Sequence, residues 1–356
     1  MHEARTGMIE QLADAGFAPA AAAVAAGLIP GATLGVVTCD GARAVRVAGH
    51  AALEPAREPL TQAHWFDLAS VSKVIFTTPV ILKLADEGGL DLDAPIADVI
   101  PDLRQYDVAG ALERSLTARQ LLSHATHLPA VEPIYTYGDD PARLRALVLQ
   151  RAWRHGAPVY SDINFILLGI AIERITGAAL DAWPLPEGLR FTPEGPAVAT
   201  ERCAWRNRVL KGEVHDENAF ALHRAGHAGL FGTVAGVLDF ARGLLDGTGA
   251  SPAAIGAMRE RVNGDRTAGW ERRFAGWPGG DACADATIGH TGFTGTGLWI
   301  DFDRGIAWTL LTNRVHPTRH GADAIFAVRP AVGNALVAAF DAVARMRSVS
   351  RSAPSG

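Results

Sequence analysis

Short β-rich apolar runs occur near both ends of this chain, and helix-like patterns fill the long stretch between them. Near the N-terminus, residues 32–37 and 44–47 flank Cys39-Asp40-Gly41, which is typical of an antiparallel hairpin. Near the C-terminus, residues 297–301 and 306–312 repeat this arrangement around a second turn. Strand patterns confined to the two ends of one chain predict a single sheet that both ends build together.

Helical periodicity dominates the middle of the chain and recurs in residues 71–87, 118–123, 141–154, 163–176 and 234–245. Two further helices are expected at 8–27 and 322–346, next to the terminal strands. We therefore predict an α+β fold, with an antiparallel sheet flanked by terminal helices and an inserted all-helical domain. The predicted divisions are a sheet domain of residues 1–70 and 281–345, a mainly helical insertion of 71–280, and a disordered tail of 346–356.

The composition excludes some classes of function. The 33 basic and 38 acidic residues give a net charge of −5, without the clustered basic face that binds nucleic acid. The charge-free stretch 17–39 is rich in alanine and is interrupted by Pro30-Gly31, so we expect neither a membrane span nor a secretory signal. Three cysteines at long spacings indicate reduced thiols, which favours a cytoplasmic protein over a periplasmic one.

The first chemical motif is Ser70-Val71-Ser72-Lys73, at the start of a predicted helix. Residues three apart lie on one face of a helix, so Lys73 is expected beside Ser70, whose hydroxyl needs a neighbouring base or cation to become nucleophilic. The chain has three lysines against 30 arginines, and only a lysine can exchange a proton near neutral pH when it is buried. The alternative is a helix start in which Ser70 caps the first turn and Lys73 faces solvent.

The second motif is Tyr160-Ser161-Asp162, directly before the helix expected from residue 163. A nearby lysine can lower the pKa of a tyrosine, which would let the phenol act as a base. The alternative is a loop tyrosine followed by an aspartate that caps the helix.

The third motif is a glycine- and threonine-rich run from His290-Thr291-Gly292-Phe293 to Gly297, before a predicted strand. Small residues beside a strand allow a substrate to approach closely, and free N–H groups there can stabilise an oxyanion. The alternative is a flexible glycine-rich loop. A phosphate-binding loop is excluded, because the glycine, lysine and serine or threonine spacing of such loops is absent.

Taken in chain order, these three motifs resemble the active-site serine family of penicillin-binding proteins, class C β-lactamases and related esterases. The resemblance covers residues 29–317 and implies a β-lactamase/transpeptidase-like fold. Supporting segments lie at 121–129, 160–169 and 226–231. A narrower likeness, to penicillin-binding-protein-like hydrolases associated with cell-wall peptides, lies at 214–219, 289–296 and 313–317.

The resemblance also implies a role for each matching residue. Ser70 would attack the acyl carbon, and Lys73 would accept or relay its proton. Tyr160 would serve as acid and base for the leaving group and for the water that deacylates the enzyme. The backbone N–H groups of Ser70 and Phe293 would form the oxyanion hole. The residues expected to bind or orient the substrate are Asp162, His290, Thr291 and Gly292.

Three positions depart from the family pattern. Asp162 stands where class C enzymes have asparagine, and beside Lys73 it would hold that lysine charged. His290 stands where β-lactamases have lysine, and a histidine is only partly cationic at neutral pH, so a β-lactam carboxylate should dock more weakly. Thr126-His127 replaces a small residue and a glycine and would reshape the rim of the site. The first two changes favour an esterase or peptidase over an efficient β-lactamase.

We therefore expect a serine hydrolase that cleaves an amide or ester bond of a small-molecule or short-peptide substrate through a Ser70 acyl-enzyme, without a cofactor. The alternatives are a weak class C-like β-lactamase and a non-catalytic protein that binds muropeptides or β-lactams. No metal centre is expected, since His223 and His227 are four residues apart but no HExxH motif occurs. The oligomeric state stays open.

Overall fold

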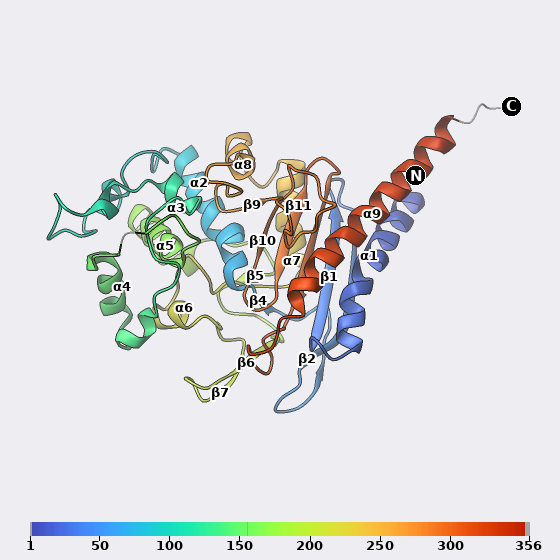
Figure 1. Ribbon diagram of the computed structural model, residues 1–356, viewed down its shortest axis with the longest axis horizontal. Coiled ribbons are helices and arrows are strands. Elements are labelled where there is room, and N and C mark those ends of the chain that lie inside the picture. Colours follow the sequence, from blue (N-terminus) through green and yellow to red (C-terminus); the bar gives the residue numbers. More distant parts are fainter. Residues whose placement is uncertain (1, 155, 353–356) are drawn as a thin grey trace.

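The centre of the fold is a seven-stranded antiparallel sheet with the strand order β3-β2-β1-β12-β11-β10-β9 (Figure 1). The computed structural model describes residues 2–154 and 156–352. The predicted hairpins are β1 (Gly31–Thr38) with β2 (Arg43–Ala52), and β11 (Gly297–Asp301) with β12 (Ile306–Thr312). Strand β1 pairs with β12 along nearly its whole length, so the two ends of the chain meet in the middle of one sheet, as predicted.

Three strands of this sheet were not predicted from the sequence. They are β3 (Glu58–Pro59), β9 (Glu271–Arg272) and β10 (Ile288–Thr291). Two of them contain only two residues, and β10 contains the first two residues of the glycine-rich motif, for which a flexible loop was the alternative. His290 and Thr291 therefore lie on a strand, held in register by β11.

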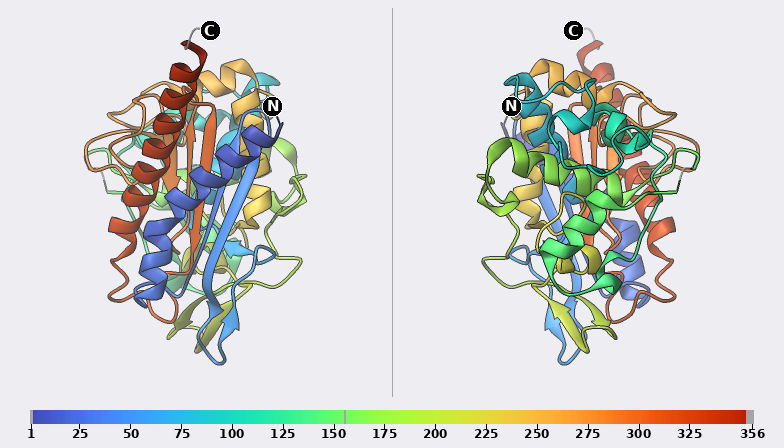
Figure 2. Two further views of the ribbon diagram at one scale, coloured as in Figure 1. Left: turned by 90° about the vertical axis from the view of Figure 1, so that its right-hand side faces the viewer. Right: turned by 90° about the vertical axis from the view of Figure 1, so that its left-hand side faces the viewer.

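Two terminal helices cover one face of the sheet. Helices α1 (His2–Ala25) and α9 (Ile325–Ser352) lie side by side there (Figure 2). Leu12 and Leu336 are buried between these helices and the sheet, together with Trp299 and Trp308 of β11 and β12. The burial of these large side chains explains why both chain ends have helical, apolar patterns next to their strands.

Helix α9 corrects the prediction of a disordered tail and bears on the question of a membrane span. It continues to Ser352, so residues 346–352 are helical and not a disordered tail, while 353–356 lie outside the described residues. Its stretch Ile325–Met346 is long and apolar enough to cross a membrane by length and composition. Val332 and Leu336 of this stretch are buried in the core, while 39% of its apolar window is buried in all.

The opposite face of the sheet carries helix α7 (Val234–Asp246), which packs on β1 and β12. Gly35 of β1 allows this approach, because a Cβ there would lie 2.6 Å from a methyl group of Val234. Both α7 and β9 come from the segment assigned to the helical insertion, so that segment also contributes to the sheet layers. It is not all-helical either, since it contains β5 (Leu189–Arg190), β6 (Ala199–Cys203), β7 (Arg208–Lys211) and β8 (Phe231–Gly232).

The remaining helices form a separate group beside the sheet (Figure 1). The longest, α5 (Asp162–Thr176), is buried on nearly all sides and ends at Gly177, whose left-handed conformation stops the helix. The others are α2 (Thr78–Asp86), α3 (Ala118–Leu122), α4 (Pro141–Gln150), α6 (Glu217–Ala221) and α8 (Pro252–Arg259). All three predicted motifs lie where this group meets the sheet.

Candidate active site

Ser70 follows a sharp turn after strand β4 (Phe66–Asp67). Ala69 has φ +47°, a left-handed conformation that a residue with a Cβ seldom adopts. The side chain of Asp67 holds this turn, since its Oδ1 accepts the Ala69 N–H at 2.8 Å and its Oδ2 accepts the His215 N–H at 2.6 Å. The chain then winds through a tight helical turn and a π-helical turn (Lys73–Thr77), which carry Ser70 and Lys73.

Lys73 is fully buried, and three oxygen atoms surround its ammonium. Its Nζ lies 3.0 Å from Ser70 Oγ, 2.9 Å from the His227 carbonyl oxygen and 2.8 Å from Asp162 Oδ1. Burial opposes the charge, but Asp162 and then Tyr160 outweigh it and raise the pKa of Lys73. The resting ammonium therefore donates to Ser70, and the alternative of a solvent-exposed lysine is wrong.

Tyr160 lies immediately before α5, with its ring against the ammonium of Lys73. The Lys73 Nζ is 5.0 Å from the ring centre. Burial raises the pKa of Tyr160, and the opposing effect of Lys73 is smaller, so the phenol is protonated at neutral pH. The prediction of a lowered tyrosine pKa is therefore wrong. The buried Tyr160 hydroxyl interacts with Lys73 and Ser70, although neither contact has ordinary hydrogen-bond geometry.

His124 fixes the backbone around Tyr160, a role that was not predicted from the sequence. Its Nδ1 accepts the Ser161 N–H at 3.0 Å and lies 3.1 Å from Asn164 Nδ2. Its ring packs against the Tyr160 ring with centroids 4.4 Å apart. Burial, with Arg266 next in effect, lowers the pKa of His124 well below its ordinary value. His124 lies in segment 121–129, which supported the family resemblance, but the sequence did not indicate the role of this histidine.

His290, on β10, is buried and neutral. Its Nδ1 lies 2.9 Å from the Thr291 carbonyl oxygen, and a carbonyl can only accept, so Nδ1 carries the proton and Nε2 does not. Burial, followed by the charges of Lys73 and Arg266, lowers the pKa of His290 well below its ordinary value. The expectation of a partly cationic histidine is therefore wrong. Nε2 is a buried acceptor with no hydrogen-bond partner among the described residues.

The loop after β10 is tied to the residues that precede Ser70. Thr294 Oγ1 donates to the Asp67 carbonyl at 2.7 Å, and Thr296 Oγ1 donates to the Leu68 carbonyl at 2.9 Å. Gly292 is required here, because a Cβ at this position would lie 2.5 Å from the Leu68 carbonyl oxygen. These contacts bring the loop beside the start of the Ser70 turn.

Phe293 is the residue expected to supply the second oxyanion N–H. Among the described residues, no hydrogen-bond acceptor contacts its backbone N–H. Its side chain is 47% exposed and stacks on the ring of His215. A free N–H beside the Ser70 segment supports the predicted oxyanion hole, which stays a prediction. Thr291 is half-buried at the end of β10.

Arg266 is a further charged group that the sequence did not single out. Its guanidinium carbon lies 5.0 Å from the centre of the Tyr160 ring, and its side chain is 26% exposed. Nη1 pairs with Glu271 Oε1 at 2.7 Å. Among 30 arginines nothing in the sequence distinguishes this one, since only the fold brings it to the site.

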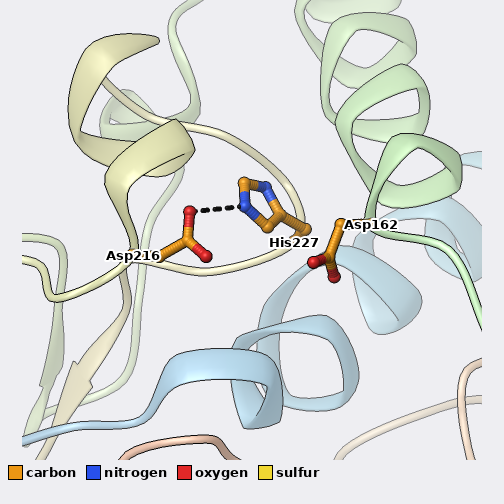
Figure 3. A group of neighbouring side chains, drawn as sticks. All are labelled: Asp162, Asp216 and His227. Atoms are coloured by element: carbon orange, nitrogen blue, oxygen red, sulfur yellow. Dashed lines mark hydrogen bonds and ion pairs between the residues drawn. The ribbon is translucent and has the colours of Figure 1, made fainter. Parts of the chain in front are cut away.

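Asp162, Asp216 and His227 lie close enough to one another to suggest a metal site (Figure 3). Their ligand atoms are within 4.8 Å of each other. However, Asp162 already pairs with Lys73, and Asp216 Oδ1 lies 2.9 Å from His227 Nε2 and accepts the Ala219 N–H. A metal cation would sit next to the Lys73 ammonium, so the charges fit it poorly. The cluster instead anchors the His227 segment, whose carbonyl accepts from Lys73.

Comparison with known proteins places the chain in a family. The family model described as Beta-lactamase matches residues 18–332. The chain belongs to the beta-lactamase family. Over 70% of its length it is similar to N-acetylmuramyl-L-alanine amidase of Bacillus subtilis, with 29% identity over 68% of that protein. It is similar over the same share to a putative D-alanyl-D-alanine carboxypeptidase of Escherichia coli K12, with 28% identity over 69% of that protein.

A solved β-lactamase-family structure shares the fold. The β-lactamase from Sulfitobacter sp. EE-36 has a TM-score of 0.70 and 22% identity, covering 96% of this chain and 99% of that one. The predicted family and the predicted β-lactamase/transpeptidase-like fold are confirmed, and the chain is a serine hydrolase of the beta-lactamase family. The structure brings Ser70, Lys73, Tyr160, Asp162 and His290 together, while the role of each residue stays a prediction.

Proposed function

We propose that this protein hydrolyses an amide bond in short cell-wall peptides through an acyl-enzyme on Ser70. The observation that supports this most directly is the Lys73 ammonium fixed between Ser70 Oγ and the Asp162 carboxylate. The names of both curated relatives describe cleavage of an amide bond to an alanine residue. An alanine-containing peptide is therefore the substrate class that we propose.

In acylation, Ser70 Oγ attacks the carbonyl carbon while its proton passes to Lys73. Lys73 is already charged, so it takes this proton only as it gives one of its own to Asp162, 2.8 Å away. The carbonyl oxygen becomes the oxyanion, facing the N–H groups of Ser70 and Phe293. Charge is conserved, because the negative charge of Asp162 moves to the oxyanion.

Collapse of the tetrahedral intermediate requires a proton for the leaving amine. Tyr160 suits this role because its raised pKa keeps the phenol protonated at neutral pH. The phenol donates to the amine as the C–N bond breaks, and Asp162 returns the proton through Lys73. In deacylation a water molecule replaces the amine and the same proton transfers run in reverse, releasing the acid and restoring Ser70.

In this proposal Arg266, and not His290, supplies the positive charge that binds a substrate carboxylate. His290 is neutral, and its Nε2 can only accept a hydrogen bond, for example from a peptide N–H. Arg266 is permanently charged, partly exposed and close to Tyr160, on the side where the leaving group must lie.

Paired substrates test this proposal. We expect hydrolysis of a D-alanyl peptide with a free carboxylate, and a lower kcat/KM for its C-terminal amide. Arg266→Gln should lower the acid-to-amide ratio of kcat/KM by about tenfold, the range for a hydrogen-bonded charge in a partly exposed site. Arg190→Gln, which removes a partly exposed arginine paired with Glu194, is the matched control and should keep the wild-type ratio.

Each alternative function gives a different result in the same assay. An unchanged acid-to-amide ratio of kcat/KM in Arg266→Gln would show that this arginine does not bind the substrate carboxylate. Turnover confined to neutral esters would identify an esterase, and turnover confined to a cephalosporin would identify a β-lactamase. A protein that binds these compounds without releasing any product would be the non-catalytic binder.

A further inference from the structure

Two arginines lie buried behind the loop 292–296 without an acidic partner. Arg329, from the first turns of α9, is 4% exposed, and Arg314, just after β12, is 8% exposed. Within the described ranges 2–154 and 156–352, neither forms an ion pair. Burying an unpaired charge is costly, so a compensating interaction has to hold each guanidinium in place.

Both guanidinium groups are held by backbone carbonyls of the loop. Arg329 Nη2 donates to the carbonyl oxygens of Gly292 and Thr296, each at 2.7 Å. Arg314 Nε donates to the Phe293 carbonyl oxygen, also at 2.7 Å. Burial, and after it the nearby Arg314, lower the pKa of Arg329 to about 9, which leaves its charge intact at neutral pH.

The two arginines bond to different peptide groups, and this difference matters. The carbonyl of Gly292 and the N–H of Phe293 are the two ends of one planar, conjugated peptide group. A charged donor on that carbonyl draws electron density from the nitrogen and makes the N–H a stronger donor. The Phe293 carbonyl belongs to the next peptide group, whose N–H is that of Thr294. Only Arg329 therefore acts on the N–H that was assigned to the oxyanion hole.

We propose that Arg329 is a positioning residue that strengthens the oxyanion hole through the Gly292–Phe293 peptide group. The inference rests on the proposed function, since the oxyanion forms only in acyl transfer. No described carboxylate forms an ion pair with Arg329, although Glu271 acts on it at longer range, so a positive field still reaches the negative oxygen of the tetrahedral intermediate. The carbonyl of a bound substrate has much less charge, so Arg329 affects kcat far more than KM.

Substitutions of Arg329 that remove or weaken its charge test this inference. We expect Arg329→Gln to lower kcat about tenfold, a fraction of the loss on removing an oxyanion donor outright. A boronic acid that forms a tetrahedral adduct with serine should bind more weakly by the same factor, while KM changes less than about twofold. Arg329→Lys should also lose much of the activity, because burial without a carboxylate partner favours the neutral form of a lysine.

Arg314→Gln is the matched control, since it removes a similarly buried charge that bonds to the same loop. Its effect on kcat and on boronic acid affinity should be clearly smaller than that of Arg329→Gln. Circular dichroism and thermal unfolding check that each variant is folded. Arg329→Met, which preserves the buried volume, takes the place of Arg329→Gln should that variant not fold.

Two results would overturn the inference. One is an equal loss of kcat in the Arg329 and Arg314 variants, and the other is a higher KM with unchanged kcat and boronic acid affinity. Either would show that Arg329 only supports the loop. Failure of the proposed function is a separate result, because the wild-type protein would then neither hydrolyse a substrate nor bind the boronic acid.

Discussion

The fully buried Lys73 depends on Asp162 for its charge. Without a carboxylate beside it, burial would favour the neutral amine, as it does for lysines in apolar sites. The pairing distance of 2.8 Å and the raised pKa of Lys73 show that the carboxylate outweighs burial. At this site the resting lysine is a donor to Ser70, and it can act as a base only through proton transfer to Asp162.

Asp162→Asn should therefore change the pH profile as well as the rate. Removal of the carboxylate takes away the interaction that raises the pKa of Lys73, so this pKa falls. The alkaline limb of kcat/KM should move to lower pH by about 1 unit or more. At neutral pH kcat should fall by about tenfold or more, because asparagine cannot take up the proton that Lys73 passes on.

The control for this experiment is Asp239→Asn, which removes an exposed carboxylate that pairs with Arg43. Its profile should match the wild type. An unshifted alkaline limb in Asp162→Asn would mean that Lys73 does not set that limb, and the proton route through Asp162 would have to be abandoned.

Local spacing made some of these residues predictable from the sequence. The three-residue spacing in Ser70-x-x-Lys73 determines contact within one helical turn, and Asp162 follows Tyr160 by two residues. The neutral state of His290 was not predictable, because it results from burial and from the charges of Lys73 and Arg266. Arg329 and Arg266 were missed for the same reason, since each reaches the site only through long-range packing.

At the scale of elements, β10 and the following loop set the geometry of the site. Gly292→Ala would place a methyl group 2.5 Å from the Leu68 carbonyl oxygen and closer still to Thr296 Oγ1. We expect a destabilisation of about 1–3 kcal/mol and a lower kcat, because the loop must move away from the segment that carries Ser70. Denaturant unfolding and steady-state kinetics measure the two effects.

Gly256→Ala in α8 is the matched control, because a Cβ there has no atom within 4 Å. It should stabilise the helix by about 0.5–1 kcal/mol and leave kcat unchanged. If Gly292→Ala behaved in the same way, the close packing of the loop on Leu68 would not be needed for activity.

Long elements were easier to predict than short ones. The terminal helices and the two hairpins have enough apolar periodicity to be recognised, and both hairpins occur as expected. Strands β3 and β9 are two residues long, and β10 contains Gly289 among only four residues. Such strands exist because neighbouring strands hold them in register, which no local pattern indicates.

At the scale of the whole molecule, the two ends of the chain form the sheet and the middle forms most of the helical group. This arrangement places the candidate site at the junction between the two parts. Ser70 and Lys73 begin the helical group, Tyr160 precedes and Asp162 begins its longest helix, and His290 comes from the sheet. Helix α7 and strand β9 belong to the predicted helical insertion but pack on or join the sheet. This could not be predicted, because their own sequence patterns do not indicate what they pack against.

The central claim is that Ser70 is the nucleophile, and covalent labelling tests it most directly. Wild-type protein, Ser70→Ala and Ser72→Ala are treated with an alkyl fluorophosphonate and analysed by intact mass and peptide mapping. Ser72 is a matched control, because its hydroxyl is buried and accepts the Leu230 N–H. We predict one adduct, on Ser70, in the wild type and in Ser72→Ala, and none in Ser70→Ala. An equal adduct in Ser70→Ala, or an adduct on another residue of the wild type, would contradict the account.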